Sequence, residues 1–307
     1  MCPTVGDFVS FSRSRQSANI AIKSVRFDQD KSTIVVVPTM DTNGPLASTV
    51  NKLYDPIPVV FVESSGEYFN YSRSVNRGIR FALEHNPDWI IVSNDDMFRI
   101  DPSKKLLTGL ECDKGHDYVM GVRVTNAGPS SGLTYIIPLS AISLPLLVQK
   151  SLKGRYALAA GLSSLRHLAD NHAKYTLLDA GSLVRTPRSL VRRLVAAAVS
   201  FHYPPFYNVF DFAAFRSATL RLERFDETYI NGFEDFDMSI RLAMHYSVGL
   251  VDFRIGSLPH TSLGRSSPLS SLDLRGTYNL AYLNTKLFSD TKGPGSVADF
   301  DPWQIPS

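Results

Sequence analysis

The stretch PDWIIVSNDDM, residues 87–97, decides how the chain is expected to fold. Its apolar run WIIV, residues 89–92, is short, and such a run predicts a strand that is buried on both faces of a parallel sheet. The run stops at Ser93-Asn94, and Asp95 and Asp96 follow at once. Two carboxylates therefore stand at the carboxyl end of a predicted strand, which is the edge where open α/β sheets bind their ligands.

The two adjacent carboxylates have two interpretations. They repel each other, so the pair needs a cation or several hydrogen-bond donors nearby. One interpretation is a divalent cation, Mg²⁺ or Mn²⁺, held together with a substrate diphosphate. The other is an Asn-Asp turn in which Asp95 and Asp96 only cap the segment that follows. The residues of this stretch alone leave both open.

Two further strands and two helices are predicted upstream. Residues 33–37 (TIVVV) and 58–62 (PVVFV) are apolar runs rich in β-branched side chains, which favour strands. Gly44-Pro45 opens a short helix, and residues 72–83 have the spacing of a second helix. Alternating strands and helices predict a Rossmann-like nucleotide-binding half over residues 32–125, with a mostly parallel central sheet flanked by helices.

The polar ends of these strands converge on one edge of the predicted sheet. They carry five candidate side chains: Thr39, Asp41, Glu63, Asp95 and Asp96. No GxGxxG follows the first strand and no GxxxxGK[ST] occurs, so the chain lacks both the dinucleotide fingerprint and the P-loop. We therefore expect a phosphate-bearing ligand to be held by a metal and by side chains.

Residues 225–241, FDETYINGFEDFDMSIR, form the second stretch with candidate chemistry. Apolar residues at helical spacing follow its acidic centre: Phe236, Ile240 and Ala243. Glu234 and Asp235 thus stand at the N-terminus of a predicted helix. Asp235 either caps this helix, where the dipole and free N–H groups stabilise a carboxylate, or is a general base that the helix aims at an acceptor hydroxyl.

The remaining segments are less informative. Three further strands are predicted over residues 118–124, 133–137 and 249–255. A closing helix is predicted over residues 275–286. Residues 133–148, roughly 16 in number and interrupted by two prolines, fall short of a membrane span, so we interpret them as buried strand and loop. His260, in a loop rich in Pro, Gly and Ser, is either exposed or a third metal ligand.

Length, charge and cysteine content set the broad class. The chain has 307 residues, of which 44% are hydrophobic, and its net charge of +3 is too small to indicate a nucleic-acid partner. Cys2 and Cys112 lack metal-ligand spacing, and two free thiols fit a reducing cytosol. Because no signal-peptide pattern opens the chain, we expect a cytoplasmic protein.

A basic helix is predicted after Thr186-Pro187. It places Arg188, Arg192 and Arg193 away from its apolar face. That basic face is either solvated or contacts anionic lipid headgroups, at the inner face of a membrane, or an anionic acceptor. The expected domain organisation is an N-terminal arm over residues 1–31, a single domain over 32–290 and a C-terminal tail over 291–307.

Taken together, these stretches resemble the family 2 glycosyltransferases, which have the GT-A fold. Three blocks carry the resemblance: IVVVPT at 34–39; FVESSG, NYSRSVNRGIRFAL and WIIVSNDDM between 61 and 97; and FDETYINGFEDFDMSIRL at 225–242 with PHTS at 259–262. They are similar to the family's strand ending in Pro-Thr, its acidic second strand end, Asn-x-Gly helix and Asp-rich metal motif, and its FDE…GxED…R with a later His. The order and spacing match over residues 33–262.

The resemblance implies an inverting transfer of a sugar from a UDP-, GDP- or dTDP-linked donor to a glycan or lipid-linked acceptor, with Mn²⁺ or Mg²⁺. By position it implies these roles: Pro38, Thr39, Glu63, Arg73, Asn76 and Asp95 on the donor, Asp96 and His260 on the metal, Asp235 as catalytic base and Glu234 on the acceptor. It also implies an acceptor-binding half over residues 126–290, with a helical insertion at about 140–210.

Three departures from the family pattern stand out. The metal motif reads Asn-Asp-Asp, Glu63 replaces the usual Asp and leaves the nucleotide's base undefined, and the segment 135–210 is longer than a minimal member needs.

Two other function classes compete. A sugar-phosphate nucleotidyltransferase would need a glycine-rich phosphate loop, which residues 38–44 lack. A non-catalytic sugar-binding protein would show a broken acidic set, whereas the acids are all present.

Overall fold

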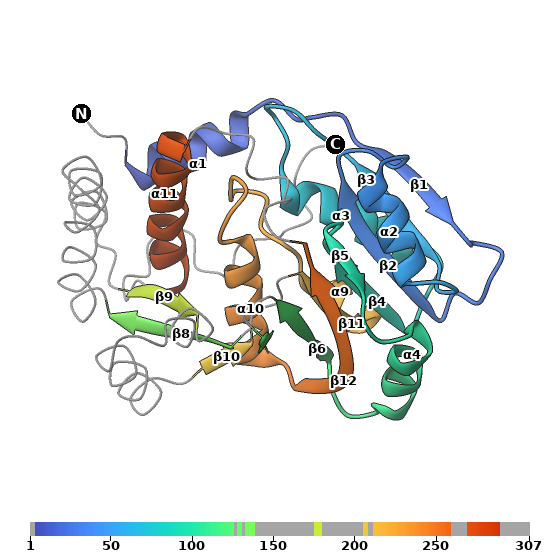
Figure 1. Ribbon diagram of the computed structural model, residues 1–307. Helices are drawn as coiled ribbons and strands as arrows, with labels where there is room; N and C mark the ends of the chain where they lie inside the picture. The colour runs from blue at the N-terminus through green and yellow to red at the C-terminus, as the bar shows by residue number, and fades with distance from the viewer. Residues whose placement is uncertain are drawn as a thin grey trace.

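The computed structural model describes residues 4–125, 128–130, 133–138, 175–179, 205–207, 211–258 and 269–288. The strands are β1 Ala21–Val25, β2 Thr33–Thr39, β3 Val59–Glu63, β4 Trp89–Ser93, β5 Met97–Arg99, β6 Tyr118–Thr125, β7 Gly128–Ser130, β8 Leu133–Pro138, β9 Tyr175–Asp179, β10 Pro205–Tyr207, β11 Phe212–Arg216 and β12 Val248–Ser257. The helices are α1 Val5–Ser14, α2 Pro45–Leu53, α3 Tyr71–Leu83, α4 Ser103–Cys112, α9 Ser217–Leu222, α10 Glu234–His245 and α11 Leu269–Phe288 (Figure 1).

The alternation predicted for the first half of the chain is confirmed. β2, α2, β3, α3 and β4 follow one another, and β2 pairs in parallel with both β3 and β4. Gly44 is the N-cap of α2 and Pro45 opens its first turn, where a missing N–H costs nothing. The side chain of Asn70 caps α3 by accepting a hydrogen bond from the backbone N–H of Arg73. Local signals therefore suffice for this half.

The whole sheet is mixed, so the prediction of a mostly parallel sheet is wrong beyond β4. Nine strands run in the order β1-β3-β2-β4-β11-β6-β12-β5, with β7 attached to β6. The β6–β12 pair is parallel, but β11 lies antiparallel to both neighbours, β4 and β6. Because β11 joins strands that are distant in the chain, its pairing is decided by tertiary contacts that no local pattern encodes.

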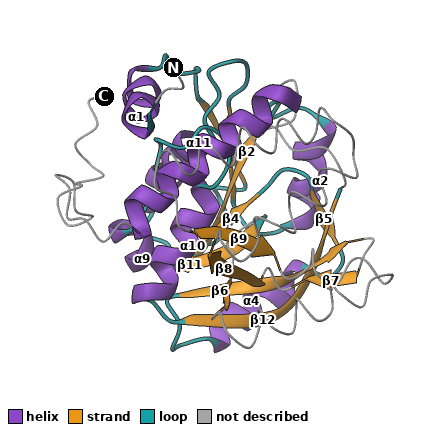
Figure 2. Ribbon diagram, turned by 90° about the vertical axis from the view of Figure 1, so that its left-hand side faces the viewer, coloured by secondary structure: helices purple, strands orange, loops and turns teal. Residues whose placement is uncertain are grey.

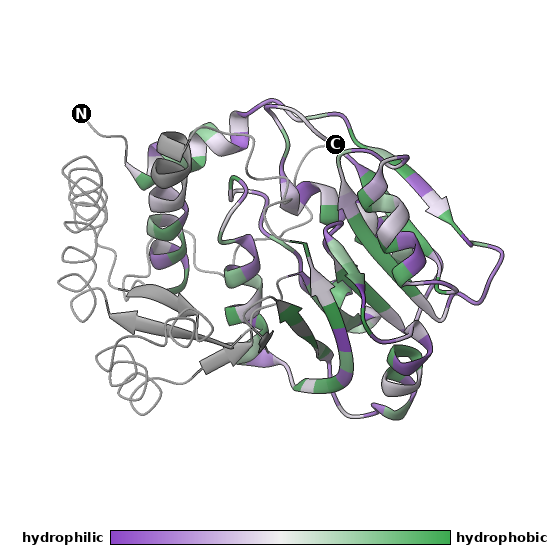
Figure 3. Cartoon of the chain, in the orientation of Figure 1, coloured by the Kyte–Doolittle hydropathy of each residue, from purple (hydrophilic) through white to green (hydrophobic). Residues whose placement is uncertain are grey.

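Helices cover both faces of the sheet (Figure 2). One face packs against α2 and α4, through side chains such as Val50 and Leu106. The other packs against α3, α9 and α10, through side chains such as Ile79 and Met238. The strands between them are the most hydrophobic part of the drawn chain (Figure 3). This three-layer arrangement explains why β2 and β4 are buried along their whole length.

Residues 4–31, predicted to be a loosely held arm, are built into the fold instead. α1 packs beside α11, and the rings of Phe8 and Tyr278 stack with their centroids 5.6 Å apart (Figure 1). β1 pairs antiparallel with β3 and forms one edge of the sheet. Most of β1 is exposed, which explains why its residues show no alternation of polar and apolar side chains.

Little of the predicted insertion lies within the described residues. Its described parts are strands, because β9 and β10 pair antiparallel with β8 in a separate three-stranded sheet. The predicted basic helix with Arg188, Arg192 and Arg193 lies outside the described residues, as does the tail over 291–307. Within the described ranges, no helix combines the length and apolar character that crossing a membrane requires.

Candidate functional site

A cavity of about 320 Å³ lies where the carboxyl end of β4 faces the start of α10. Its described lining consists of Pro38, Phe69, Tyr71, Asn94, Asp95, Asp96, Asp211, Asn231, Gly232, Phe233, Glu234, Asp235 and Phe236. Five of these residues are acidic, and none of the described lining residues is basic. The cavity therefore brings together the two stretches that the sequence singles out, although they are far apart along the chain.

The first wall of the cavity is the end of β4 and the neighbouring end of β2. Asp95 and Asp96 are only 4% and 6% exposed, so both carboxylates are largely removed from water. The hydroxyl of Thr39 donates a hydrogen bond to Oδ2 of Asp95 at 2.8 Å. Burial raises the pKa of Asp95, and the hydroxyl of Thr39 opposes that rise. Thr39 thus acts on the site through Asp95, while Pro38 lines the cavity itself.

The opposite wall is a turn in an uncommon backbone conformation. Asn231, Gly232 and Phe233 have φ values of 48°, 153° and 72°, all in the left-handed region that favours glycine. Two of these residues are not glycine, and such local strain is a known feature of functional sites. Phe233 is the N-cap of α10 and makes no side-chain cap, so Asp235 is the second residue of the helix and not its cap.

The carboxyl group of Asp235 is in an electrostatically unfavourable position. Burial, together with the negative charges of Glu234 and Asp211, raises the pKa of Asp235 well above its ordinary value. One hydrogen bond works against this rise, because Oδ1 accepts the N–H of Phe236 at 2.9 Å. Asp235 still keeps part of its surface open to the cavity. A carboxyl group with a raised pKa at a cavity wall is suited to take up a proton.

Asp211 and Tyr71 belong to the cavity although the sequence did not indicate them. The hydroxyl of Tyr71 donates to Oδ1 of Asn94 at 3.0 Å, and the amide of Asn94 donates to Oδ1 of Asp211 at 2.8 Å. Burial raises the pKa of Tyr71, and four surrounding carboxylates add to the rise, so its hydroxyl stays protonated and donates. The pairing of β11 with β4 brings Asp211 here, and that pairing has no local signal.

Three residues that the resemblance places on the donor lie outside the described lining of the cavity. Glu63 accepts the backbone N–H of Thr42 at 2.8 Å and so holds the loop after β2. Arg73 forms an ion pair with Glu227 at 3.1 Å. Asn76 donates to the carbonyl of Phe225 at 2.8 Å. In this structure Arg73 and Asn76 connect α3 to the segment that leads toward Asp235, and their expected donor contacts stay a prediction.

The residues expected to bind a metal are placed only in part. Asp96 lines the cavity, whereas His260 lies outside the described residues. Over the described part of the chain, no three His, Cys, Asp or Glu side chains come close enough to form a metal site by themselves. The chemistry of the lining still suits a cation, since Mg²⁺ is usually bound by one or two carboxylates together with substrate phosphates.

No protein-family model matches the sequence, and no curated protein is significantly similar to it. Solved structures that match the chain include two with low similarity to it. The crystal structure of A197 from STIV has 16% sequence identity and a TM-score of 0.26, covering 32% of this chain and 51% of that chain. The inositol-1-phosphate CTP transferase from T. maritima has 9% identity and a TM-score of 0.34, covering 82% of this chain and 77% of that chain.

The chain is a mixed α/β protein. At these identities and TM-scores neither neighbour indicates an activity. The possible chemistry therefore follows from the residues that line the cavity. The cavity offers buried carboxylates on one wall and a carboxyl group with a raised pKa on the other, and its lining also includes the aromatic rings of Phe69, Tyr71 and Phe233. Such a lining can hold a ligand with planar or apolar faces and remove a proton from it.

Proposed function

We propose that this protein is a glycosyltransferase of the GT-A type, which moves a sugar from a nucleotide-diphosphate sugar to a hydroxyl group with inversion at the anomeric carbon. The observation that carries the proposal is that Asp96 and Asp235 line one cavity. These two residues come from the two blocks of sequence that most closely resemble family 2 glycosyltransferases. A cavity that joins them supports both roles that the resemblance implies.

The donor would lie against the β4 wall. Asp95, which accepts a hydrogen bond from Thr39, would accept others from a ribose or sugar hydroxyl, and Pro38 would give an apolar edge. Asp96, with His260 as a further ligand, would hold Mn²⁺ or Mg²⁺ together with the donor's diphosphate oxygens. When bound, such a cation neutralises the negative charge of the diphosphate as it leaves. The donor is a UDP-, GDP- or dTDP-linked sugar.

Asp235 would act as the general base. Its carboxylate accepts the proton of the acceptor hydroxyl while that oxygen forms a bond to the anomeric carbon. The bond from the anomeric carbon to the diphosphate oxygen breaks on the opposite side, and the nucleoside diphosphate leaves with the electron pair. Glu234, which is 7% exposed and also lines the cavity, would bind the acceptor through a second hydroxyl. The acceptor is a glycan or a lipid-linked glycan.

A donor screen tests this proposal. Wild-type protein is incubated with UDP-, GDP- and dTDP-sugars in the presence of Mn²⁺, Mg²⁺ or EDTA, and release of the nucleoside diphosphate is measured. We expect metal-dependent release with one nucleotide class and its loss in Asp96→Asn. The control is Glu111→Gln, which removes an exposed carboxylate on α4, far from the cavity lining, and should behave as wild type.

Parallel assays separate the competing function classes. Release of pyrophosphate from a nucleoside triphosphate and a sugar phosphate would point to a nucleotidyltransferase. Stabilisation by nucleotide sugars without any turnover would point to a non-catalytic binding protein. Flotation with anionic liposomes at low salt tests peripheral membrane contact through Arg188, Arg192 and Arg193.

A further inference from the structure

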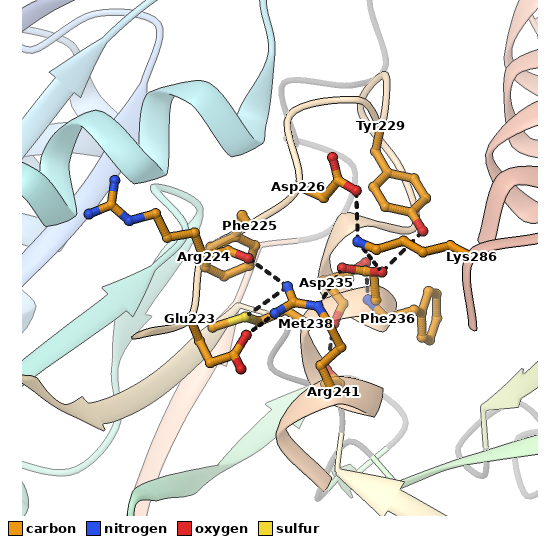
Figure 4. Close-up of polar contacts among 12 residues, drawn as sticks. Glu223, Arg224, Phe225, Asp226, Tyr229, Asp235, Phe236, Met238, Arg241 and Lys286 are labelled. Carbon is orange, nitrogen blue, oxygen red and sulfur yellow. Dashed lines mark hydrogen bonds and ion pairs between the residues drawn. The ribbon is translucent and has the colours of Figure 1, made fainter. Parts of the chain in front are cut away.

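A buried network of charges connects α10 with α11 and with the segment that precedes α10 (Figure 4). Asp237 is fully buried and accepts from two cations at once. Its Oδ2 is 2.9 Å from Nε of Arg241, and its Oδ1 is 2.8 Å from Nζ of Lys286. Arg241 also pairs with Glu223. Lys286 comes from the end of α11, so the network joins two helices that are distant in sequence.

The position of Asp237 relates this network to the candidate base. Successive residues of an α-helix are about 100° apart, so residues two positions apart point to nearly opposite sides. Asp235 lines the cavity, and Asp237 is buried in the charge network. Fixing Asp237 therefore fixes the rotation of the first turn of α10 about its own axis. That rotation decides where the carboxylate of Asp235 points.

Lys286 also holds the segment that enters the cavity wall. Its Nζ lies 2.7 Å from Oδ2 of Asp226, and the hydroxyl of Tyr282 donates to the same oxygen at 2.9 Å. The hydroxyl of Tyr229 in turn donates to Oδ1 of Asp237 at 3.3 Å. Asp226 and Tyr229 precede the left-handed turn at 231–233. Lys286 thus bonds to both ends of the piece of chain that bends around Asp235.

We propose that Lys286 is a positioning residue for Asp235, and that α11 sets the geometry of the catalytic wall through it. This inference rests on the proposed function for its kinetic consequence, but its structural consequence is independent of it. Lys286 does not contact the reacting atoms, because it does not belong to the described cavity lining. Its role is to hold the segment 226–230 and the first turn of α10 in one fixed arrangement relative to each other.

The charge balance explains why a cation is needed at this point. Three carboxylates, of Glu223, Asp226 and Asp237, are shared by Arg241 and Lys286. Burial would raise the pKa of Asp226, but Lys286 and Thr228 outweigh it and lower the pKa to about 2. Without Lys286 the carboxylates of Asp226 and Asp237 would face each other with one cation, and they would separate. The turn between them would lose its fixed shape.

The test combines hydrogen exchange with kinetics. Lys286→Met removes the charge and keeps the length of the side chain, whereas Lys286→Arg keeps the charge. We expect faster amide exchange in Lys286→Met over residues 226–240 and unchanged exchange in β2 and β4. We also expect kcat to fall roughly 10- to 100-fold with the donor KM near wild type, as misplacement of a catalytic group by about 1 Å produces. Lys286→Arg should recover most of both properties.

Two further variants keep the test decisive. Asp101→Asn breaks another ion-pair cluster, in which Asp101 is buried and its partners Arg254 and Lys105 are partly exposed. It should lower stability without changing exchange at 226–240 or kcat. If Lys286→Met does not fold, the double variant Lys286→Met, Asp226→Asn removes the cation together with one carboxylate, so less uncompensated charge stays buried.

Unchanged exchange over 226–240 in a folded Lys286 variant would overturn the inference, and so would a kcat that falls equally in Asp101→Asn. A wild-type protein without any sugar transfer would overturn the proposed function only. In that case the exchange pattern, which needs no substrate, still decides whether Lys286 positions the wall that carries Asp235.

Discussion

Asp235 occupies a position that costs the fold stability and suits a proton acceptor. Its pKa is raised by burial and by the charges of Glu234 and Asp211, so at neutral pH the ionised form is destabilised in the folded state. The hydrogen bond from the N–H of Phe236 recovers part of this cost. A residue that only capped the helix would show the opposite balance, since capping stabilises the folded state.

Replacing Asp235 with Asn should therefore raise the stability of the protein. The pKa of Asp235 is higher in the folded state than in the unfolded state. The carboxyl group therefore lowers stability at every pH above the unfolded value, and a neutral amide removes that penalty. Asn can still accept the N–H of Phe236. We expect a higher Tm for Asp235→Asn at pH 7.5, measured by calorimetry. A lower Tm would indicate that Asp235 stabilises the helix start.

Asp96 should be required for metal-dependent binding of the donor's nucleotide. It is buried at the ligand edge of the sheet and is the candidate carboxylate for the cation. In Asp96→Ala we expect the affinity for UDP or GDP with Mn²⁺ to fall by at least about tenfold, measured by titration calorimetry. Glu111→Gln should bind as wild type. Unchanged metal-dependent affinity in folded Asp96→Ala would remove this residue from the site.

At the scale of single residues, the sequence predicts those that stand next to a strong local pattern. Asp95 and Asp96 follow a buried strand, and Glu234 and Asp235 open an amphipathic helix, so their places could be read directly. Asp211 could not, because it enters the cavity only through the pairing of β11 with β4. Arg73 and Asn76 could be matched to a family motif, yet their partners Glu227 and Phe225 come from a distant segment.

Two glycines within helices show how packing decides the effect of the same substitution. A Cβ added at Gly78 in α3 would lie 2.4 Å from Cγ1 of Val36 and 2.7 Å from Cγ2 of Val62. A Cβ added at Gly276 in α11 would have no heavy atom within 4 Å among its described surroundings. Gly78 therefore sets how closely α3 approaches β2 and β3, whereas Gly276 has no such role.

Gly78→Ala and Gly276→Ala should change stability in opposite directions. We expect Gly78→Ala to cost about 1–3 kcal/mol of unfolding free energy, because it overpacks the contact between helix and sheet. Gly276→Ala should gain up to about 1 kcal/mol from helix propensity. Urea unfolding of both variants measures the difference. Equal effects of the two substitutions would contradict the packing of α3 on the sheet.

At the scale of elements, prediction succeeds where the pattern is local and fails where pairing is long-range. The caps of α2 and α3 and the buried runs of β2, β3 and β4 are visible in the sequence. The antiparallel strand β11 and the edge strand β1 are not, because the first depends on tertiary contacts and the second is mostly exposed. Of the apolar face expected on α10, Ile240 is buried but Ala243 is exposed.

The whole molecule contains carboxyl groups shifted in both directions, which determines its stability as a function of pH. Asp226 and Asp101 have lowered pKa values, mainly from Lys286 at Asp226 and from Arg254 at Asp101. Their stabilising contribution is present above the unfolded value near 3.8 and is lost as pH falls below it, at Asp226 toward about 2. Asp95 and Asp235 have raised values, so their ionisation lowers stability as pH rises.

These opposite contributions predict a stability maximum at mildly acidic pH. Stability should increase as pH falls toward the unfolded value near 3.8, because Asp95 and Asp235 take up protons in the folded state, and should decrease steeply below that value, toward about pH 2. Lys286→Met should move the acid transition to higher pH. Thermal unfolding in a series of buffers measures both limbs. A stability that continues to rise below pH 3 would contradict the ion pairs of Asp226 and Asp101.

The whole molecule also explains why the cavity lies where it does. The parallel strands of the first half supply Asp95 and Asp96, and the second half returns through β11 and α10 to supply Asp211, Glu234 and Asp235. Each half alone contributes only one wall. We propose that the two walls form one catalytic site, in which Asp235 on the second wall removes the proton.

The most direct measurement is the initial rate of sugar transfer in Asp235→Asn beside wild type, with donor affinity measured on the same preparations. If Asp235 is the base, the transfer rate falls by roughly 10²–10⁴-fold while metal-dependent donor binding stays near wild type. Asp235→Asn protein that turns over near the wild-type rate would contradict the account, because the described cavity lining would then hold donor-binding carboxylates but no established base.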